Sequence, residues 1–120
     1  MSTSASEAGE APKIRGKASI LVVEEQFVSE FLRSALTHQG YNVLCASPGA
    51  ARAMLRREPE KIQVLVTNVP LEFAAFPDVP VLYLSACPDP AQTELFARAL
   101  MLAKPFQPRL LFESVAQLLP

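Results

Sequence analysis

The feature that most constrains the fold of this chain is a set of short apolar runs that each stop at a polar residue. Ile20–Val23 is the first of these runs, and two glutamates follow it. Val64–Thr67 ends at Asn68, and Val79–Leu84 ends at Ser85. Apolar runs without polar alternation are typical of strands that are covered on both faces of a parallel sheet. The runs therefore predict a buried parallel β-sheet.

Segments with helical signals separate the first runs. Large apolar residues recur at helical spacing between Phe27 and Leu36, and Gly40 provides a left-handed stop. A second strand is expected at Tyr41–Ala46. Ser47 is followed by a proline, which is the pattern of an N-cap residue and the first helical position. We expect the helix that begins there to end before Pro59.

The C-terminal part repeats these signals. Asp89-Pro90 has the same cap-plus-proline pattern and predicts a helix that uses Leu95, Phe96 and Ala99. A short strand at Leu100–Ala103 and a last helix opening at Gln107-Pro108 follow. Strands that alternate with helices imply right-handed parallel crossovers. The expected fold is therefore α/β, a doubly wound parallel sheet of five strands.

Length and charge limit the organisation and the classes of partner. The 120 residues suit one domain. Residues 1–16 are rich in Ser, Ala, Glu and Gly and predict a disordered arm, so the folded domain is expected at 17–120. The formal net charge of −1 provides no field that would attract nucleic acid or an anionic membrane. The chain has no secretory signal and no apolar run long enough to span a bilayer, which predicts a cytoplasmic location.

Polar residues at the ends of the strands are the candidate functional residues. In doubly wound sheets, ligands bind at the carboxyl ends of the strands. That rule selects five residues, each of which follows or ends an apolar strand: Glu24, Glu25, Asn68, Ser85 and Lys104.

Four short motifs at these strand ends carry a family resemblance. They are ILVVEE at 20–25, VLVTN at 64–68, LYLSA at 82–86 and AKPF at 103–106. In this order, the chain from residue 18 to 120 resembles the receiver domain of bacterial response regulators, the CheY-like superfamily. The resemblance implies a flavodoxin-like strand order of 2-1-3-4-5 and a role in two-component, phosphorelay-type signalling.

The resemblance also implies roles for individual residues. Glu24 and Glu25 match the acidic pair that holds Mg²⁺ in receivers, although each side chain is one methylene longer than the usual aspartate. Ser85 matches the hydroxyl switch residue, and Lys104 matches the cation that binds phosphoryl oxygens. Pro105 matches a proline that usually follows a cis peptide bond in that family.

Asn68 is the decisive departure, because it occupies the position of the aspartate that accepts the phosphoryl group. An amide is not a nucleophile of the carboxylate kind, so we expect no acyl phosphate there. The pocket also loses one negative charge, so we expect Mg²⁺ to bind weakly and to be dispensable, and the long glutamates to reach Lys104 or the Asn68 amide directly. The chain is thus interpreted as a pseudo-receiver that acts through protein contacts and is not an enzyme.

Two other functions remain open. The first is a phosphorelay receiver that is phosphorylated at a non-standard residue, namely Glu24, Glu25 or Ser85. The second is an unrelated doubly wound enzyme or nucleotide binder. A phosphate-binding version of the latter needs a glycine-rich turn after a strand, and none of the four glycines lies in such a turn.

Two further departures concern surfaces. Met101 lies three residues before Lys104, where many receivers have an aromatic switch residue. Only ten residues, 69–78, separate the third strand from the fourth, so the helix of that crossover is expected to be shortened or missing. Apolar residues of this loop either fold back over the sheet or form an interaction patch that another chain covers; they are Leu71, Phe73 and Phe76.

The expected partners are other signalling proteins, either a kinase or an output protein, or a second copy in a homodimer. In receivers, the face made by the fourth helix, the fifth strand and the fifth helix commonly mediates dimerisation. The resemblance places that face at about Pro90–Ala103 and Pro108–Leu119. Three aromatic residues, Phe27, Phe31 and Phe112, are expected in the core.

Overall fold

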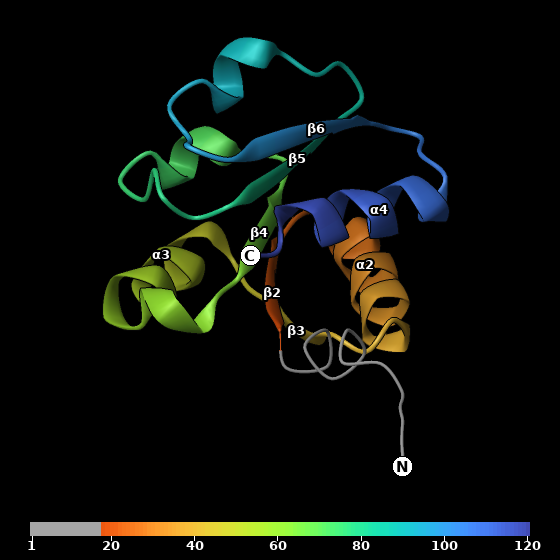
Figure 1. Ribbon diagram of the computed structural model, residues 1–120, viewed down its shortest axis with the longest axis horizontal. Coiled ribbons are helices and arrows are strands. Elements are labelled where there is room, and N and C mark those ends of the chain that lie inside the picture. The colour runs from red at the N-terminus through yellow and green to blue at the C-terminus, as the bar shows by residue number, and fades with distance from the viewer. Residues whose placement is uncertain (1–17) are drawn as a thin grey trace.

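A single parallel sheet organises the chain (Figure 1). The computed structural model describes residues 18–120, so the predicted disordered arm at 1–16 lies outside the described residues. The strands are β2 (Ser19–Val23), β3 (Asn42–Cys45), β4 (Val64–Thr67), β5 (Val81–Ser85) and β6 (Ala99–Ala103). Their spatial order is β3-β2-β4-β5-β6, and every neighbouring pair is parallel. This is the order 2-1-3-4-5 and confirms the predicted fold class.

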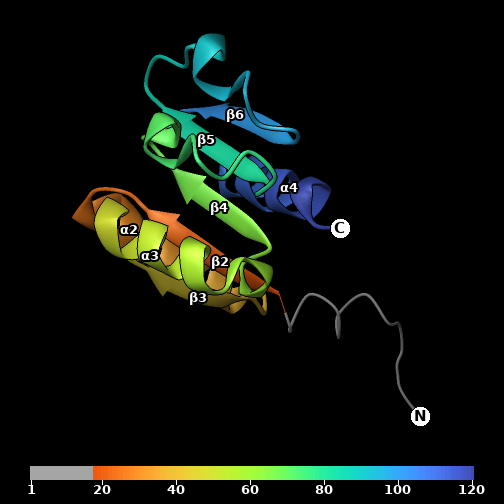
Figure 2. The ribbon, with the colours of Figure 1, turned by 90° about the vertical axis from the view of Figure 1, so that its left-hand side faces the viewer.

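Three α-helices cover the two faces of the sheet. They are α2 (Gln26–His38), α3 (Pro48–Arg57) and α4 (Pro108–Leu118). Helices α2 and α4 lie on one face, and α3 lies on the other (Figures 1 and 2). Within residues 18–120, no helix has the length and apolar character needed to cross a bilayer.

Local signals end and begin these helices where the sequence predicts. Gly40, with φ of +97°, adopts the left-handed conformation just after α2, which a residue with a Cβ adopts only at a cost. Ser47 caps α3, since its Oγ accepts a hydrogen bond of 3.2 Å from the amide of Ala50.

The two faces of the sheet explain why the strand runs lack polar alternation. Ile20 and Val22 of β2 pack in the cluster beneath α2 and α4. Leu21 and Val23, which alternate with them, pack in a second cluster on the face of α3. All four side chains are buried. Burial on both faces therefore selects apolar residues at every position of the strand.

The crossover from β4 to β5 has no α-helix, as predicted. It contains a single 3₁₀ turn, η2 (Pro70–Phe73). Phe73 is fully buried against the α3-side cluster and Phe76 is partly buried there, whereas Leu71 is 51% exposed. The loop thus covers its own stretch of sheet mainly with Phe73.

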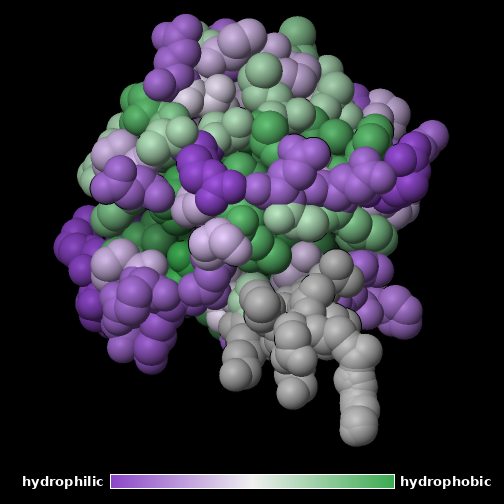
Figure 3. All heavy atoms as spheres, viewed as in Figure 1, coloured by the Kyte–Doolittle hydropathy of each residue, from purple (hydrophilic) through white to green (hydrophobic). Residues whose placement is uncertain are grey.

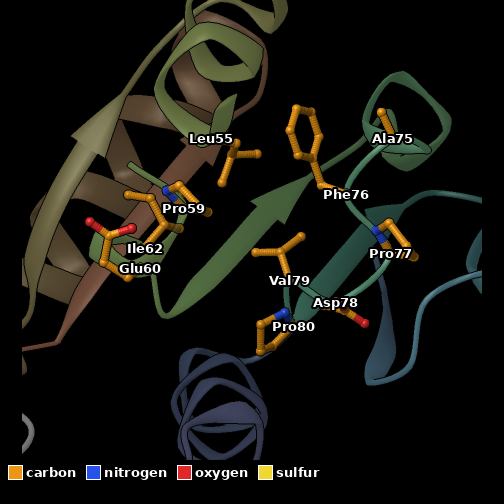
Figure 4. Close-up of a pocket in the computed structure, with 10 residues that line it drawn as sticks. All are labelled: Leu55, Pro59, Glu60, Ile62, Ala75, Phe76, Pro77, Asp78, Val79 and Pro80. Carbon is orange, nitrogen blue, oxygen red and sulfur yellow. The ribbon is translucent and has the colours of Figure 1, made fainter. Parts of the chain in front are cut away.

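This cover is incomplete and leaves an apolar pocket of about 390 Å³ at the amino-terminal edge of the sheet. Leu55 from the end of α3 and Phe76 and Val79 from the loop before β5 surround it (Figure 4). Three prolines also line the pocket, at positions 59, 77 and 80. Proline restricts the backbone on either side of the pocket.

The predicted helix that begins at Asp89-Pro90 is wrong. Asp89 does cap the segment, because its Oδ1 accepts a hydrogen bond of 3.0 Å from the amide of Ala91. Only a 3₁₀ turn, η3 (Pro90–Thr93), forms there, and the chain enters β6 at Ala99. Phe96 is buried while Leu95 is 41% exposed, so the segment has no apolar stripe to pack. A short helix in water depends on such packing, which explains its absence.

Candidate functional site

The carboxyl ends of four parallel strands meet at one edge of the sheet. Val23 pairs with Thr67, and Ser85 pairs with Ala103. The residues that follow or end these strands therefore come to the same edge: Glu24, Asn68, Ser85 and Lys104.

A buried ion pair joins the residue that follows the first strand, Glu24, to the residue that follows the last strand, Lys104. The Nζ of Lys104 lies 2.9 Å from Oε2 of Glu24 and donates a hydrogen bond of 3.2 Å to Oε1. The contact with Oε2 lacks hydrogen-bond alignment, so Oε2 interacts with the ammonium through charge alone. The Glu24 side chain is 0% exposed and the Lys104 side chain is 23% exposed.

One further group stabilises the Glu24 carboxylate. The backbone amide of Glu25 donates a hydrogen bond of 3.2 Å to Oε1. A carboxylate removed from water needs such compensation, because burying an isolated charge costs on the order of several kcal/mol. Lys104 is thus the counter-ion of Glu24, and the two residues are separated by 80 positions in the chain.

Asn68 lies at the end of β4 but faces a different neighbourhood. Its backbone amide donates to the carbonyl of Val23 at 3.4 Å. Its side chain borders an open cleft of about 500 Å³. Within residues 18–120, no hydrogen bond or ion pair joins this side chain to Glu24, Glu25 or Lys104. The edge therefore presents a neutral amide beside the cleft.

The cleft beside Asn68 has polar walls that sequence reasoning missed. Arg52 of α3 and Glu72 of η2 form an ion pair across it. Tyr83 and Gln92 complete the lining. Strand alternation in β5 could have placed Tyr83 on this face, since Leu82 and Leu84 pack on the other. Nothing in the sequence pairs Arg52 with Glu72, because the contact depends on the shortened crossover.

The remaining predicted site residues serve local structure. The Oγ of Ser85 accepts a hydrogen bond of 3.0 Å from the amide of Cys87 in the loop after β5. The Lys104-Pro105 peptide bond is cis. Glu25 is exposed and occupies the N-cap position of α2, although its side chain makes no capping bond. Met101 is 41% exposed on β6.

The residues at this edge do not fit a magnesium ion. Mg²⁺ demands near-octahedral oxygen ligation. Both oxygens of Glu24 face the Lys104 ammonium, and its side chain has no exposed surface. In the described part of the chain, no group of three or more acidic, histidine or cysteine side chains comes together. A metal ion would have to displace Lys104 from Glu24.

An apolar groove borders the same edge on the side of α2. Phe27 and Phe31 of α2 line it together with Pro105 and Phe106, and its volume is about 280 Å³. The rings of Phe31 and Phe106 have centroids 6.2 Å apart. Phe27 is 84% exposed and Phe31 is 44% exposed, so the prediction that both are core residues is wrong. Phe112 does pack against the core and is partly buried.

The error has a simple geometric cause. Helical spacing identifies an apolar stripe, but the stripe from Phe27 to Leu36 is wider than the surface that the sheet covers. Leu32 and Leu36 take the buried positions, and the phenylalanines stand at the margin near the end of β6. Two exposed aromatic side chains therefore stand beside the strand-end edge.

Comparison with known proteins shows the fold. No family model and no curated protein matches the sequence. Among solved structures, the chemotaxis response regulator CheY4 of Vibrio cholerae has a TM-score of 0.71 and 21% identity, covering 85% of this chain and 98% of that one. The structure of a putative response regulator from Chloroflexus aurantiacus has a TM-score of 0.70 and 23% identity, covering 84% of this chain and 96% of that one.

The receiver domain of the hybrid histidine kinase CckA is similar to the same degree. Its TM-score is 0.70 and its identity is 22%, with 86% of this chain and all of that domain covered. The chain therefore has the receiver fold. At this level of identity the similarity concerns the backbone, and the chemistry of the site has to be argued from the side chains.

Proposed function

We propose that this chain is a receiver-like signalling module of the two-component type that is not phosphorylated at its strand-end site and regulates through protein contacts. The observation that carries this proposal is Asn68 at the end of β4. A phosphoryl group is transferred to a carboxylate oxygen in receivers, and the Asn68 amide has no such anion. The proposed module binds other signalling proteins, a kinase or an output protein, and needs no cofactor.

The ion pair supports the same proposal. In a phosphorylatable pocket, a lysine has to be available to the incoming phosphoryl oxygens. Here Lys104 lies 2.9 Å from a glutamate whose side chain is 0% exposed. Releasing it would leave a carboxylate charge without its counter-ion in a buried position. The pair thus favours a single arrangement of the pocket.

The alternative is phosphorylation at another residue of the edge. Glu24 is buried and paired, and the Ser85 hydroxyl is engaged by the Cys87 amide. Glu25 is the exposed carboxylate among the three. A phosphorelay receiver of this kind would form its acyl phosphate on Glu25.

The groove beside the edge is the proposed contact surface for a signalling partner. Phe27, Phe31 and Phe106 line it, and the acidic residues Glu25 and Glu30 lie exposed on the same helix end. Aromatic anchors with a polar rim are typical of protein-binding sites. A partner that presents an apolar side chain between basic ones would fit this surface.

Phosphorylation of the purified chain tests the proposal. The chain is incubated with Mg²⁺ and acetyl phosphate, whose phosphoryl group passes to a carboxylate oxygen with acetate as the leaving group, and the intact mass is measured. We expect no phosphoryl adduct. The variant Asn68→Asp restores the carboxylate nucleophile. Because Lys104 is held by Glu24, we expect the variant to acquire at most one phosphoryl group, labile to hydroxylamine, and only as far as Mg²⁺ displaces Lys104 from Glu24.

Each outcome separates the alternatives. A phosphoryl adduct on the unmodified chain that Glu25→Gln abolishes would support the non-standard receiver and refute the proposal. If the single variant Asn68→Asp acquires no adduct but the double variant Asn68→Asp, Lys104→Arg does, the ion pair of Lys104 with Glu24 also limits the reaction. A known phosphorylatable receiver in the same reaction controls for the phosphodonor.

A further inference from the structure

The outer edge of β6 is one of the two free edges of the sheet, because β6 stands last in the strand order. β6 is the last strand of the sheet, and within residues 18–120 no other strand pairs with its outer side. Its sequence is Ala-Leu-Met-Leu-Ala, without charge, proline or glycine. Natural proteins often place charged residues or proline on an edge strand, because its unpaired backbone groups otherwise pair readily with another chain. The five residues of β6 include neither.

The hydrogen bonds of the sheet identify the backbone groups that point outward. The amide of Val81 donates to the carbonyl of Arg98 at 3.1 Å, and the amide of Lys104 donates to the carbonyl of Ser85 at 2.8 Å. Successive residues of a strand direct their backbone groups to opposite sides. Arg98, Leu100, Leu102 and Lys104 therefore bond toward β5. The three residues between them direct their amides and carbonyls outward: Ala99, Met101 and Ala103.

These outward groups lie at an apolar surface. Met101 is 41% exposed, and Ala103 is also exposed. None of the three outward residues makes a backbone hydrogen bond outside the sheet in the described part of the chain. In Figure 3, apolar surface gathers over the region where Figure 1 draws β6.

The sequence of β6 reads the same in both directions about Met101. We propose that two copies of this chain pair through their β6 edges, antiparallel and with the two-fold axis at Met101, to form one continuous sheet. Met101 then lies opposite Met101 of the second copy, Ala99 opposite Ala103, and Leu100 opposite Leu102. A two-fold interface requires this kind of self-complementarity.

The proposed register also uses every outward backbone group. In an antiparallel pair, opposite residues that both face the partner exchange two hydrogen bonds. Centring the axis on Met101 creates three such pairs, because Ala99, Met101 and Ala103 all find an outward partner. An axis centred on Leu100 would place Ala103 opposite a residue outside β6, and an axis centred on Leu102 would do the same to Ala99. The register is therefore specified by the backbone as well as by the side chains.

The charges at the ends of β6 are compatible with this pairing. The register places Arg98 of one copy opposite Lys104 of the other, and like charges in that position are unfavourable. Lys104 is held by Glu24 at 2.9 Å, and Arg98 donates to the carbonyl of Gln117 at 2.8 Å. Both cations are thus directed onto their own chain.

This interface differs from the one that the receiver resemblance implies. That face needs a helix between β5 and β6, and here the segment forms only η3. The proposal does not depend on Asn68, so it stands or fails separately from the proposed function.

Cysteine cross-linking tests the register. In a background with Cys45→Ser and Cys87→Ser, the variants Ala99→Cys and Ala103→Cys are oxidised alone and as a mixture. The proposed register separates two cysteines at position 99 by about 13 Å, four residues at about 3.3 Å each. A 99–103 pair has Cα atoms about 5.5 Å apart, within the range of a disulfide. We expect the mixture to form a disulfide-linked heterodimer and each variant alone to remain largely uncross-linked.

The oligomeric state tests the surface. Size-exclusion chromatography with light scattering across a concentration series should show a dimer of the unmodified chain. Met101→Lys adds a charge at the two-fold axis, and we expect it to weaken the dimer by about tenfold or more. Leu71→Lys, at a residue that is also exposed but lies in η2 and not on β6, is the matched control and should leave the dimer unchanged.

Three results would overturn the proposal. They are a monomer at every concentration, a dimer that Met101→Lys does not weaken although the variant is folded by circular dichroism, and equal cross-linking of Ala99→Cys alone and in the mixture. The last result would indicate a different register or a different surface.

Discussion

Replacing Lys104 by methionine should destabilise the fold more than any surface charge change, because it leaves Glu24 without its counter-ion. The Glu24 side chain has no exposed surface, and its remaining hydrogen bond comes from the Glu25 amide at 3.2 Å. Methionine keeps the length of the apolar stem of lysine, so the change removes the charge with little loss of packing. The effect should therefore report the ion pair itself.

The magnitude follows from burial. Removing one partner of a fully buried pair costs about 3–5 kcal/mol. Lys104 is 23% exposed, so water can partly replace the ammonium, and we expect Lys104→Met to lower the free energy of unfolding by about 2–4 kcal/mol. Glu24→Gln removes the other charge. In a double-mutant cycle, the two changes should couple by about 1–3 kcal/mol.

Urea denaturation followed by circular dichroism measures these energies. Lys61→Met is the matched control, because Lys61 pairs with Glu58 at 3.2 Å while both side chains are largely exposed, 66% and 53%. A surface pair of this kind contributes about 0–1 kcal/mol. If Lys104→Met costs no more than Lys61→Met, or if its effect is simply additive with Glu24→Gln, the ion pair does not stabilise the edge as argued here.

Three other changes test the fold. Phe73→Ala should cost about 3–5 kcal/mol in the free energy of unfolding because Phe73 is fully buried, whereas Leu71→Ala should cost less than about 1 kcal/mol; equal effects in urea denaturation would contradict self-covering by the loop. Gly40→Ala should lower the free energy of unfolding by about 1–2 kcal/mol, since a Cβ at Gly40 meets nothing within 4 Å and the cost comes from the positive φ alone. An unchanged melting temperature would argue against that strain. Ser47→Ala should cost about 1 kcal/mol through the lost cap of α3, with Ser47→Gly nearer to neutral in the same melt.

The sheet and most of the helices could be predicted from local sequence. Strands covered on both faces need apolar residues at every position, which makes Ile20–Val23 and Val64–Thr67 recognisable on their own. Caps and the left-handed Gly40 act within a few residues, so they are visible in the sequence as well. The ten-residue crossover limited what could form between β4 and β5.

The predictions failed where a segment has local helix signals but no surface to pack against. Asp89-Pro90 resembles a helix start and does cap a turn, yet only Phe96 of the following segment becomes buried at the core. Phe27 and Phe31 show the reverse case, because helical spacing cannot tell how wide a face the sheet will cover. Burial is a property of the assembled layers.

For the site, too, the sequence predicts which residues are present, whereas the tertiary structure decides which of them are in contact. Which residues stand at the strand ends, including an amide at position 68, follows from the order of the strands and could be stated from the sequence. That Lys104 is held by Glu24 across 80 positions, that Arg52 meets Glu72 beside Asn68, and that β6 presents an unpaired edge are decided by the tertiary structure. Sequence pattern reports what each residue does to its immediate neighbours, whereas pairing of distant charges and exposure of an edge depend on how strands and loops come together in space.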